Sequence, residues 1–158
     1  MVQRLMKRWR FQPAREHMAG DIGVATKVGT GRLRPSVLVV EDEVLIRLLI
    51  AEELRSLGIQ VLEASNADEA LRILESSLSV HVLFTDIRMP GRMDGLGLRR
   101  FVREHYPQLK VMLTSSHQPE NYADASTDVF VAKPYDVNAV LQQVKLLLMQ
   151  SGYDFGLS

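Results

Sequence analysis

Five short apolar segments recur between residues 36 and 149, each with the length of one buried β-strand. They span residues 37–40, 60–64, 80–85, 111–113 and 129–132. Apolar runs of this length, bounded by turn residues, are typical of strands in a parallel sheet. Because helical patterns separate most of them, the sequence predicts an α/β fold with a doubly wound, five-stranded parallel sheet and helices on both faces.

Apolar spacing and capping residues predict the helices that join these strands. After the first strand, Val44, Leu45, Leu48 and Leu49 recur at helical spacing. Asn66 and Asp136 are expected to be the N-caps of two later helices. Three later helices are expected from apolar residues at helical spacing: Ala70, Leu71, Ile73 and Leu74 in one, Leu98, Phe101 and Val102 in the next, and Val137, Val140, Leu141, Val144 and Leu147 in the last.

The composition fits one globular domain with its own core. The chain has 158 residues, 46% of them hydrophobic, and no cysteine. Disulfides and thiolate metal sites are therefore excluded, which is compatible with a reducing cytosol. No apolar run approaches the roughly 20 residues that span a bilayer, so we expect a cytoplasmic protein without a membrane span.

The first 35 residues differ in charge from the rest. They hold eight Lys and Arg against two Asp and Glu, which leaves eleven against seventeen in the remainder. Their glycines and prolines predict a basic, flexible leader at 1–35, followed by a domain at 36–149 and a tail at 150–158. One alternative remains, because residues 1–10 could form an amphipathic helix that binds a membrane surface or a partner.

Polar and charged residues follow several of the predicted strands. Because the carboxyl ends of parallel strands meet at one edge of the sheet, we expect these residues to converge there: Glu41, Asp42, Asp86, Thr114 or Ser115, and Lys133. Alone, Asp86 could be a nucleophile, a metal ligand or a helix cap. Clustered carboxylates repel one another unless a cation joins them, and hard oxygen ligands suit Mg²⁺. The set therefore predicts a Mg²⁺ site that also suits the transfer of a phosphoryl group to a carboxylate.

With these motifs, residues 36–149 resemble a flavodoxin-like receiver domain of two-component signalling. The resemblance implies that Asp86 is the phosphoacceptor and that Glu41 and Asp42 bind Mg²⁺ together with Asp86. It also implies that the carbonyl of Arg88 reaches the metal, and that Lys133, followed by a cis proline, pairs with the phosphoryl group.

The resemblance further implies a switch made of one hydroxyl and one aromatic residue. Phe130 lies three residues before Lys133, in the position of the aromatic residue. Counting eight residues from Pro107 gives Ser115 as the hydroxyl, and Thr114 remains the alternative.

Two stretches depart from the family pattern. The loop at 89–95 is one residue longer than the commonest spacing. Ser115 and Lys133 are 18 positions apart, about four fewer than usual, and little apolar periodicity lies between them. The fourth helix of the fold is therefore expected to be short or absent.

The leading interpretation is a stand-alone phosphoacceptor rather than a classical enzyme. It would take its phosphoryl group from a histidine kinase or a histidine phosphotransfer protein and signal by contact with an unknown downstream protein. A second interpretation is a DNA- or membrane-associated regulator that acts through the leader, although no helix-turn-helix or zinc pattern predicts direct nucleic acid binding. A third, an aspartyl phosphatase, generally requires an acid two residues after the nucleophile, where Arg88 stands instead.

Overall fold

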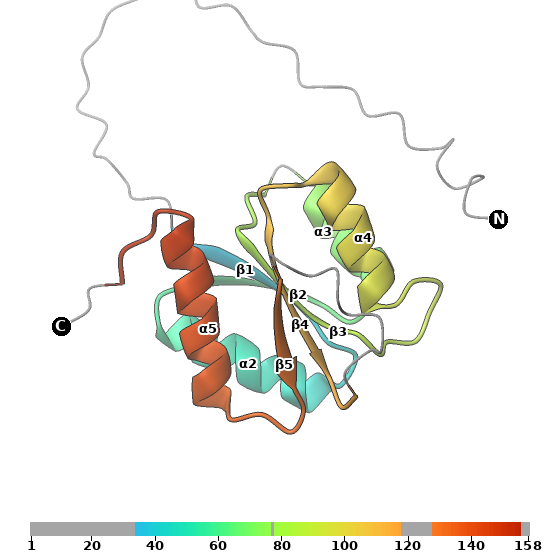
Figure 1. Ribbon diagram of the computed structural model, residues 1–158, viewed down its shortest axis with the longest axis horizontal. Coiled ribbons are helices and arrows are strands. Elements are labelled where there is room, and N and C mark those ends of the chain that lie inside the picture. The colour runs from blue at the N-terminus through green and yellow to red at the C-terminus, as the bar shows by residue number, and fades with distance from the viewer. Residues whose placement is uncertain (1–33, 77, 118–127, 156–158) are drawn as a thin grey trace, which may run out of the picture. The chain divides into compact units, whose positions relative to one another are not determined.

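The computed structural model describes residues 34–76, 78–117 and 128–155. Five strands and four helices lie in these residues, and Figure 1 shows their arrangement. The strands are β1 (Ser36–Val40), β2 (Gln60–Ala64), β3 (Val82–Asp86), β4 (Lys110–Ser115) and β5 (Val129–Ala132). The helices are α2 (Val44–Ser56), α3 (Ala67–Glu75), α4 (Gly95–His105) and α5 (Val137–Gln150). The predicted α/β architecture is confirmed.

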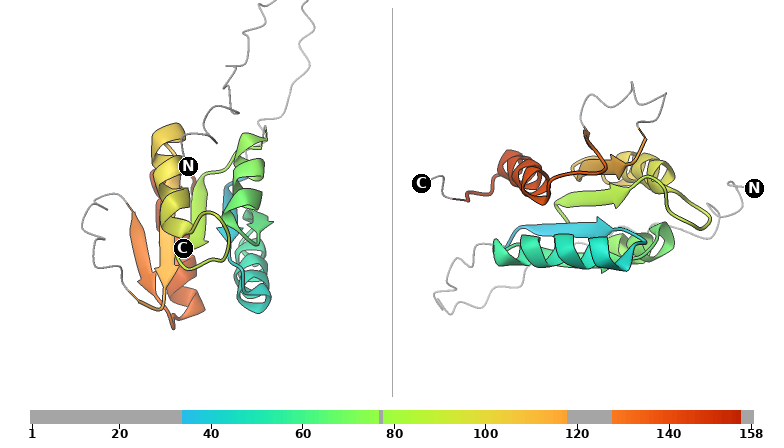
Figure 2. Two further views of the ribbon diagram at one scale, coloured as in Figure 1. Left: turned by 90° about the vertical axis from the view of Figure 1, so that its right-hand side faces the viewer. Right: turned by 90° about the horizontal axis from the view of Figure 1, so that it is seen from below.

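The strands form one parallel sheet in the order β2-β1-β3-β4-β5. In the left view of Figure 2, the orange β5 lies at one side of the sheet and the blue-green strands lie at the other. The chain runs outward from β1 to β2 and then returns to place β3 on the other side of β1. The carboxyl ends of β1 and β3 therefore flank the point where the strand order reverses, which is where such sheets bind ligands.

Each face of the sheet carries its own hydrophobic core. On one face, Leu38, Leu83 and Leu113 pack against α3 and α4. On the other face, Val39 and Phe84 pack against α2 and α5. Figure 1 shows the two helix pairs on opposite sides of the strands. The alternation of side chains along each strand divides the apolar residues between the two cores.

Three helices begin at residues whose side chains accept a hydrogen bond from the first turn. Asn66 accepts from the backbone N–H of Glu69 (2.9 Å), as expected, and Asp136 accepts from the N–H of Asn138 (3.0 Å). Asp94 caps α4 in the same way through the N–H of Gly97 (2.8 Å). These contacts satisfy amide groups that have no partner inside the helix, and they fix where each helix starts.

The apolar series in α2 does not mark the buried face of that helix. Ile50, Ala51 and Leu54 face the core, whereas the residues of the predicted series lie at the surface with 45 to 77% of their area exposed: Val44, Leu45, Leu48 and Leu49. The spacing correctly predicted a helix, but the helix is apolar on two sides. An exposed apolar surface of this kind is unusual unless a partner covers it.

Two strands extend past their predicted carboxyl ends. β3 begins at Val82 and includes Asp86, whereas β4 extends past Leu113 to Ser115. Thr114 pairs with Val131 and Ser115 with Ala132, so the ladder to β5 continues through polar residues that lie beyond the predicted strand. Backbone pairing, and not side-chain polarity, sets the end of this strand.

The expected short or absent helix between β4 and β5 falls mainly on residues 118–127, which lie outside the described residues. The leader at 1–35 falls almost wholly outside them as well. Asp128, at the entry to β5, forms ion pairs with Arg99 and Arg103 of α4. In the part of the chain that the structure describes, no helix is both long and apolar enough to cross a membrane.

Candidate functional site

The carboxyl ends of β1, β3 and β5 bring together four charged residues that are far apart in the sequence. Glu41 and Asp42 follow β1, Asp86 ends β3, and Lys133 follows β5. Carboxylate oxygens of the three acids all lie within 4.8 Å of one another. The predicted convergence of these side chains is therefore present in the structure.

Lys133 connects two of the acids. Its Nζ atom lies 2.9 Å from Oε2 of Glu41 and 2.9 Å from Oδ2 of Asp86. The Glu41 side chain is almost fully buried, whereas Asp86 and Lys133 reach the surface with a small part of their side chains. The ammonium group compensates two negative charges that would otherwise repel each other with little water between them.

Burial and pairing shift the pKa values of this group in a consistent way. Burial raises the pKa of Glu41 above its ordinary value of 4.5, although the hydrogen bond from Lys133 opposes the rise. For Lys133, burial alone would lower the pKa, but hydrogen bonds to Glu41 and Asp86 raise it above the ordinary value. Lys133 thus carries its charge at neutral pH, and burial disfavours the negative charge of Glu41.

The carboxylate of Asp86 is held at both oxygens. Oδ2 accepts from Lys133, and Oδ1 accepts from the backbone N–H of Arg88 (3.2 Å). The following residue, Ile87, donates its N–H to the carbonyl of Thr114 (2.8 Å), which continues the sheet ladder one step past the strand. Asp86 is only 7% exposed, so its orientation is fixed while a small part stays open to solvent.

Gly95 forms a close backbone contact beneath Asp86. A Cβ atom added at Gly95 would lie 2.1 Å from the carbonyl oxygen of Asp86 and 2.8 Å from the Cα of Ile87. The N–H of Gly95 also donates to the carbonyl of Ile87 (2.9 Å). Only a residue without a side chain fits here, and α4 therefore starts directly against the end of β3. Sequence reasoning quoted this glycine as part of a loop but missed its role.

Arg47 is a second residue that sequence reasoning missed. From the first turns of α2, its Nη1 donates to the carbonyl of Glu41 (2.5 Å), and its Nε lies 3.6 Å from a carboxylate oxygen of Glu63. Glu41 is also bonded through its side chain, because Oε1 accepts from the N–H of Glu43 (3.2 Å). The acidic turn after β1 is therefore fixed at its backbone and at its side chain.

A cavity of about 840 Å³ opens above these residues. Its lining includes the four charged residues together with Arg88, Ser116 and Tyr135. Of the two predicted switch hydroxyls, Ser115 and Thr114, neither lines this cavity, and both are buried. Oγ of Ser115 accepts from the N–H of His117 (3.3 Å), whereas Oγ1 of Thr114 has no hydrogen-bond partner among the described residues.

Phe130 lies on β5. It is partly buried and packs against the core formed with α3 and α4. It pairs with Leu113 of β4, and two residues further along these strands Ser115 pairs with Ala132. The Lys133–Pro134 peptide bond is cis, as expected.

The oxygen atoms at this site suit a hard divalent cation. Three carboxylates within 4.8 Å of one another, one of them exposed at Asp42, offer the donor type that Mg²⁺ prefers and leave room for water. A single ammonium does not neutralise three carboxylates. The residues present therefore fit the Mg²⁺ that the sequence predicts.

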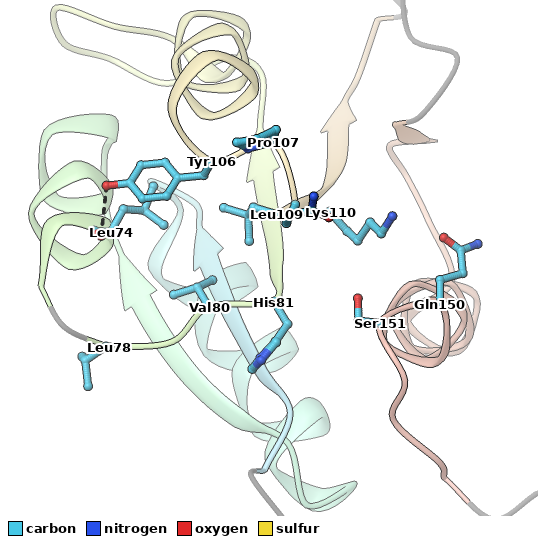
Figure 3. Close-up of a pocket in the computed structure, with 11 residues that line it drawn as sticks. Leu74, Leu78, Val80, His81, Tyr106, Pro107, Leu109, Lys110, Gln150 and Ser151 are labelled. Carbon is cyan, nitrogen blue, oxygen red and sulfur yellow. Dashed lines mark hydrogen bonds between the residues drawn. The ribbon is translucent and has the colours of Figure 1, made fainter. Parts of the chain in front are cut away.

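A second cavity, of about 540 Å³, lies at the opposite edge of the sheet, where β3 and β4 begin (Figure 3). Figure 3 shows Tyr106 at its wall with the hydroxyl bonded to the carbonyl of Leu74 (3.2 Å). His81 also lines it, but both ring nitrogens of His81 are in contact with hydroxyls, Nδ1 with Ser36 and Nε2 with Tyr153. No acidic cluster of the kind seen at the first cavity lies there in the described chain.

Comparisons with known proteins agree with this geometry. The family model described as "Response regulator receiver domain" matches residues 37–145. The transcriptional regulatory protein ResD of Bacillus subtilis is 34% identical over 119 residues, which are 73% of this chain and 48% of ResD. This chain thus spans about half the length of ResD, and it spans about a quarter of the length of the regulator NtrC of Salmonella typhimurium, with 32% identity over 117 residues.

Solved structures show the same fold. The receiver domain of the hybrid histidine kinase CckA is 33% identical, with a TM-score of 0.62 over 72% of this chain and 98% of that one. The response regulator TrrA of Thermotoga maritima, solved in complex with Mg²⁺ and BeF, is 30% identical, with a TM-score of 0.62 over the same shares of the two chains.

Proposed function

Because the chain belongs to the response regulator receiver domain family of two-component signalling, we propose that Asp86 accepts a phosphoryl group from a phosphohistidine. The donor is a histidine kinase or a histidine phosphotransfer protein. The observation that carries this proposal is Lys133, which holds the buried Asp86 and Glu41 together beside a third carboxylate at the reversal point of the sheet.

The reaction is an exchange of one bond to phosphorus for another. A carboxylate oxygen of Asp86 forms a bond to the phosphorus atom, while the bond from phosphorus to the donor's imidazole nitrogen breaks. That nitrogen keeps the electron pair, and the product is an aspartyl phosphate. Phosphoryl transfer needs positioning and charge compensation more than proton transfer, which agrees with a site made of a fixed carboxylate and a fixed ammonium.

Each neighbour of Asp86 has a separate part in this proposal. The N–H of Arg88 keeps the carboxylate from rotating, and Lys133 donates to the oxygens of the incoming group. Glu41, Asp42 and Asp86, with the carbonyl of Arg88, would hold Mg²⁺. When bound, this ion supplies positive charge beside the phosphoryl oxygens.

The exposed apolar surface of α2 gives the donor protein a place to dock. It consists of Val44, Leu45, Leu48 and Leu49, and Leu49 also lines the cavity above Asp86. A histidine on a helical donor that packs against this surface would therefore face the carboxylate. Apolar side chains 45 to 77% exposed on one helix gain free energy when a partner covers them.

Output is proposed to pass through the end of β4 to β5. Ser115 is the proposed switch hydroxyl, with Thr114 as the alternative, and Phe130 is the proposed aromatic switch. In support, the N–H of Lys133 donates to the carbonyl of Ser115 (2.9 Å). A shift at the end of β4 would therefore move the residue that follows β5. The downstream protein would read this side of the molecule.

Transfer from an autophosphorylated histidine kinase tests the proposal. A panel of purified kinases should include one that labels the wild-type chain within minutes and does not label Asp86→Asn. Leu45→Ser should slow transfer from that kinase but leave labelling by acetyl phosphate unchanged, because the small donor needs no docking surface. Equal labelling of wild type and Asp86→Asn would refute the assignment of Asp86.

A further inference from the structure

Tyr135 is one of the residues that line the cavity above Asp86. It follows Lys133 and Pro134, and its ring meets the ring of Phe84 edge to face, with centroids 6.5 Å apart and planes at 83°. Phe84 is fully buried and lies two residues before Asp86 on the same strand. The ring of Tyr135 therefore has a fixed place in the core, close to the charged residues.

The hydroxyl of Tyr135 is buried and has no hydrogen-bond partner in the described part of the chain. The charged groups near enough to influence it are Lys133, Glu41, Asp86 and Glu43. Burial, the largest effect, raises the pKa of Tyr135 to about 12. The phenol therefore keeps its proton at neutral pH and is a hydrogen-bond donor.

A buried donor without an acceptor destabilises a folded protein. It has lost its hydrogen bonds to water and has gained nothing in return. Phenylalanine would make the same ring contact with Phe84 without that cost. The carboxylates of Glu41 and Asp86 accept hydrogen bonds from Lys133, and neither accepts one from Tyr135. An acceptor that is present only in the loaded site would remove this cost.

We propose that the hydroxyl of Tyr135 donates a hydrogen bond to an anionic oxygen of the phosphoryl group carried by Asp86. This inference rests on the proposed function. Tyr135 then binds the phosphoryl group beside Lys133 but adds no charge, and it acts only when the site is loaded. A neutral donor to a charged oxygen forms a strong hydrogen bond, so the loss of the hydroxyl should weaken binding about tenfold.

Beryllofluoride, a phosphoryl mimic, tests this with the full chain. Calorimetric titration in the presence of Mg²⁺ should give a Kd about tenfold higher for Tyr135→Phe than for wild type. The melting temperature of unliganded Tyr135→Phe should equal or exceed that of wild type, because the substitution removes only an unpaired buried hydroxyl. A purely structural role for the hydroxyl would lower it.

Tyr153→Phe is the matched control. The hydroxyl of Tyr153 contacts Nε2 of His81 (2.8 Å) at the opposite edge of the sheet, so this variant should lose stability and bind beryllofluoride as wild type does. Equal Kd values for wild type and Tyr135→Phe would overturn the inference and leave the proposed function intact. A fall in melting temperature for Tyr135→Phe as large as that for Tyr153→Phe would also overturn it. A wild-type chain that binds no beryllofluoride would overturn both proposals.

Discussion

The Nζ atom of Lys133 lies 2.9 Å from Oδ2 of Asp86, although 47 residues separate them in the sequence. The same ammonium lies 2.9 Å from Oε2 of Glu41. One cation thus stabilises two acids that the fold buries side by side, and the folded state depends on it. The balance of charges at this site therefore affects the stability of the fold as well as the chemistry of the site.

Replacement of Lys133 should lower stability in a pH-dependent way. Lys133→Met keeps the aliphatic stem but leaves Glu41 and Asp86 to repel each other, and we expect a loss of about 2 kcal/mol in the free energy of unfolding at pH 7. The loss should shrink as the pH falls toward 4.5, because protonation of Glu41 removes the repulsion. Urea denaturation at pH 7 and pH 5 measures both values. A loss that is equal at the two pH values would contradict this account.

The negative charge of Glu41 should lower the free energy of unfolding at neutral pH. The pKa of Glu41 is higher in the folded chain than its ordinary value of 4.5. At a pH between 4.5 and the pKa of the folded chain, the folded state therefore binds more protons than the unfolded state. Stability is then lost as the pH rises through this window and is recovered below 4.5. In EDTA, Glu41→Gln should melt at a higher temperature than wild type at pH 7, and the difference should vanish at low pH.

The same substitution should weaken the binding of Mg²⁺, because it removes one carboxylate from the cluster. Adding Mg²⁺ should therefore raise the melting temperature of wild type more than that of Glu41→Gln. Glu53→Gln, an exposed position on α2, is the control and should match wild type in both measurements. A variant at Glu41 that is less stable than wild type in EDTA at pH 7 would disprove the sign of this effect.

Gly95 should not tolerate a side chain. The methyl group of Gly95→Ala would lie 2.1 Å from the carbonyl oxygen of Asp86, so the backbone at the site must move. We expect a loss of about 3 kcal/mol in stability, at the upper end for overpacking, together with slower phosphorylation by acetyl phosphate. Gly97→Ala is the control: its methyl group would lie 2.8 Å from Cγ of Met93 and 3.3 Å from the capping Oδ1 of Asp94, and because both are side-chain atoms that can shift, the loss of stability should be much smaller. Similar melting temperatures for the two variants would contradict the proposed contact.

Deletion of residues 1–32 should leave the fold and the phosphorylation unchanged. Leu33–Ser158 form one compact unit, and the composition of the leader does not predict a core of its own. The melting temperature should stay within about 2 °C of the full chain. A fall of about 5 °C, equivalent to roughly 1 kcal/mol, would show that the leader stabilises the domain.

The order of the elements and the charged site were predictable from sequence because both depend on strand ends. A parallel sheet places every carboxyl end at one edge, so Asp86 and Lys133 had to approach each other once both strands were recognised. The exposure of Leu45 was not predictable, because α2 is apolar on two sides and periodicity alone does not say which side is buried.

The contacts of Gly95 and Tyr135 were beyond sequence reasoning for another reason. Both depend on how closely two elements approach, and a pattern within one segment carries no such distance. A glycine after Asp94 looks like an ordinary turn, and a tyrosine after Lys133-Pro134 looks like a core aromatic residue. Only packing shows that the first touches the backbone of Asp86 and that the second buries an unpaired hydroxyl.

Intact-mass measurement after treatment with acetyl phosphate and Mg²⁺ tests the central claim most directly. We predict that wild type gains the mass of one phosphoryl group, that Asp86→Asn gains none, and that EDTA prevents the gain in wild type. Equal gains in wild type and Asp86→Asn, or a wild type that gains nothing, would contradict the assignment of Asp86 as the phosphoacceptor.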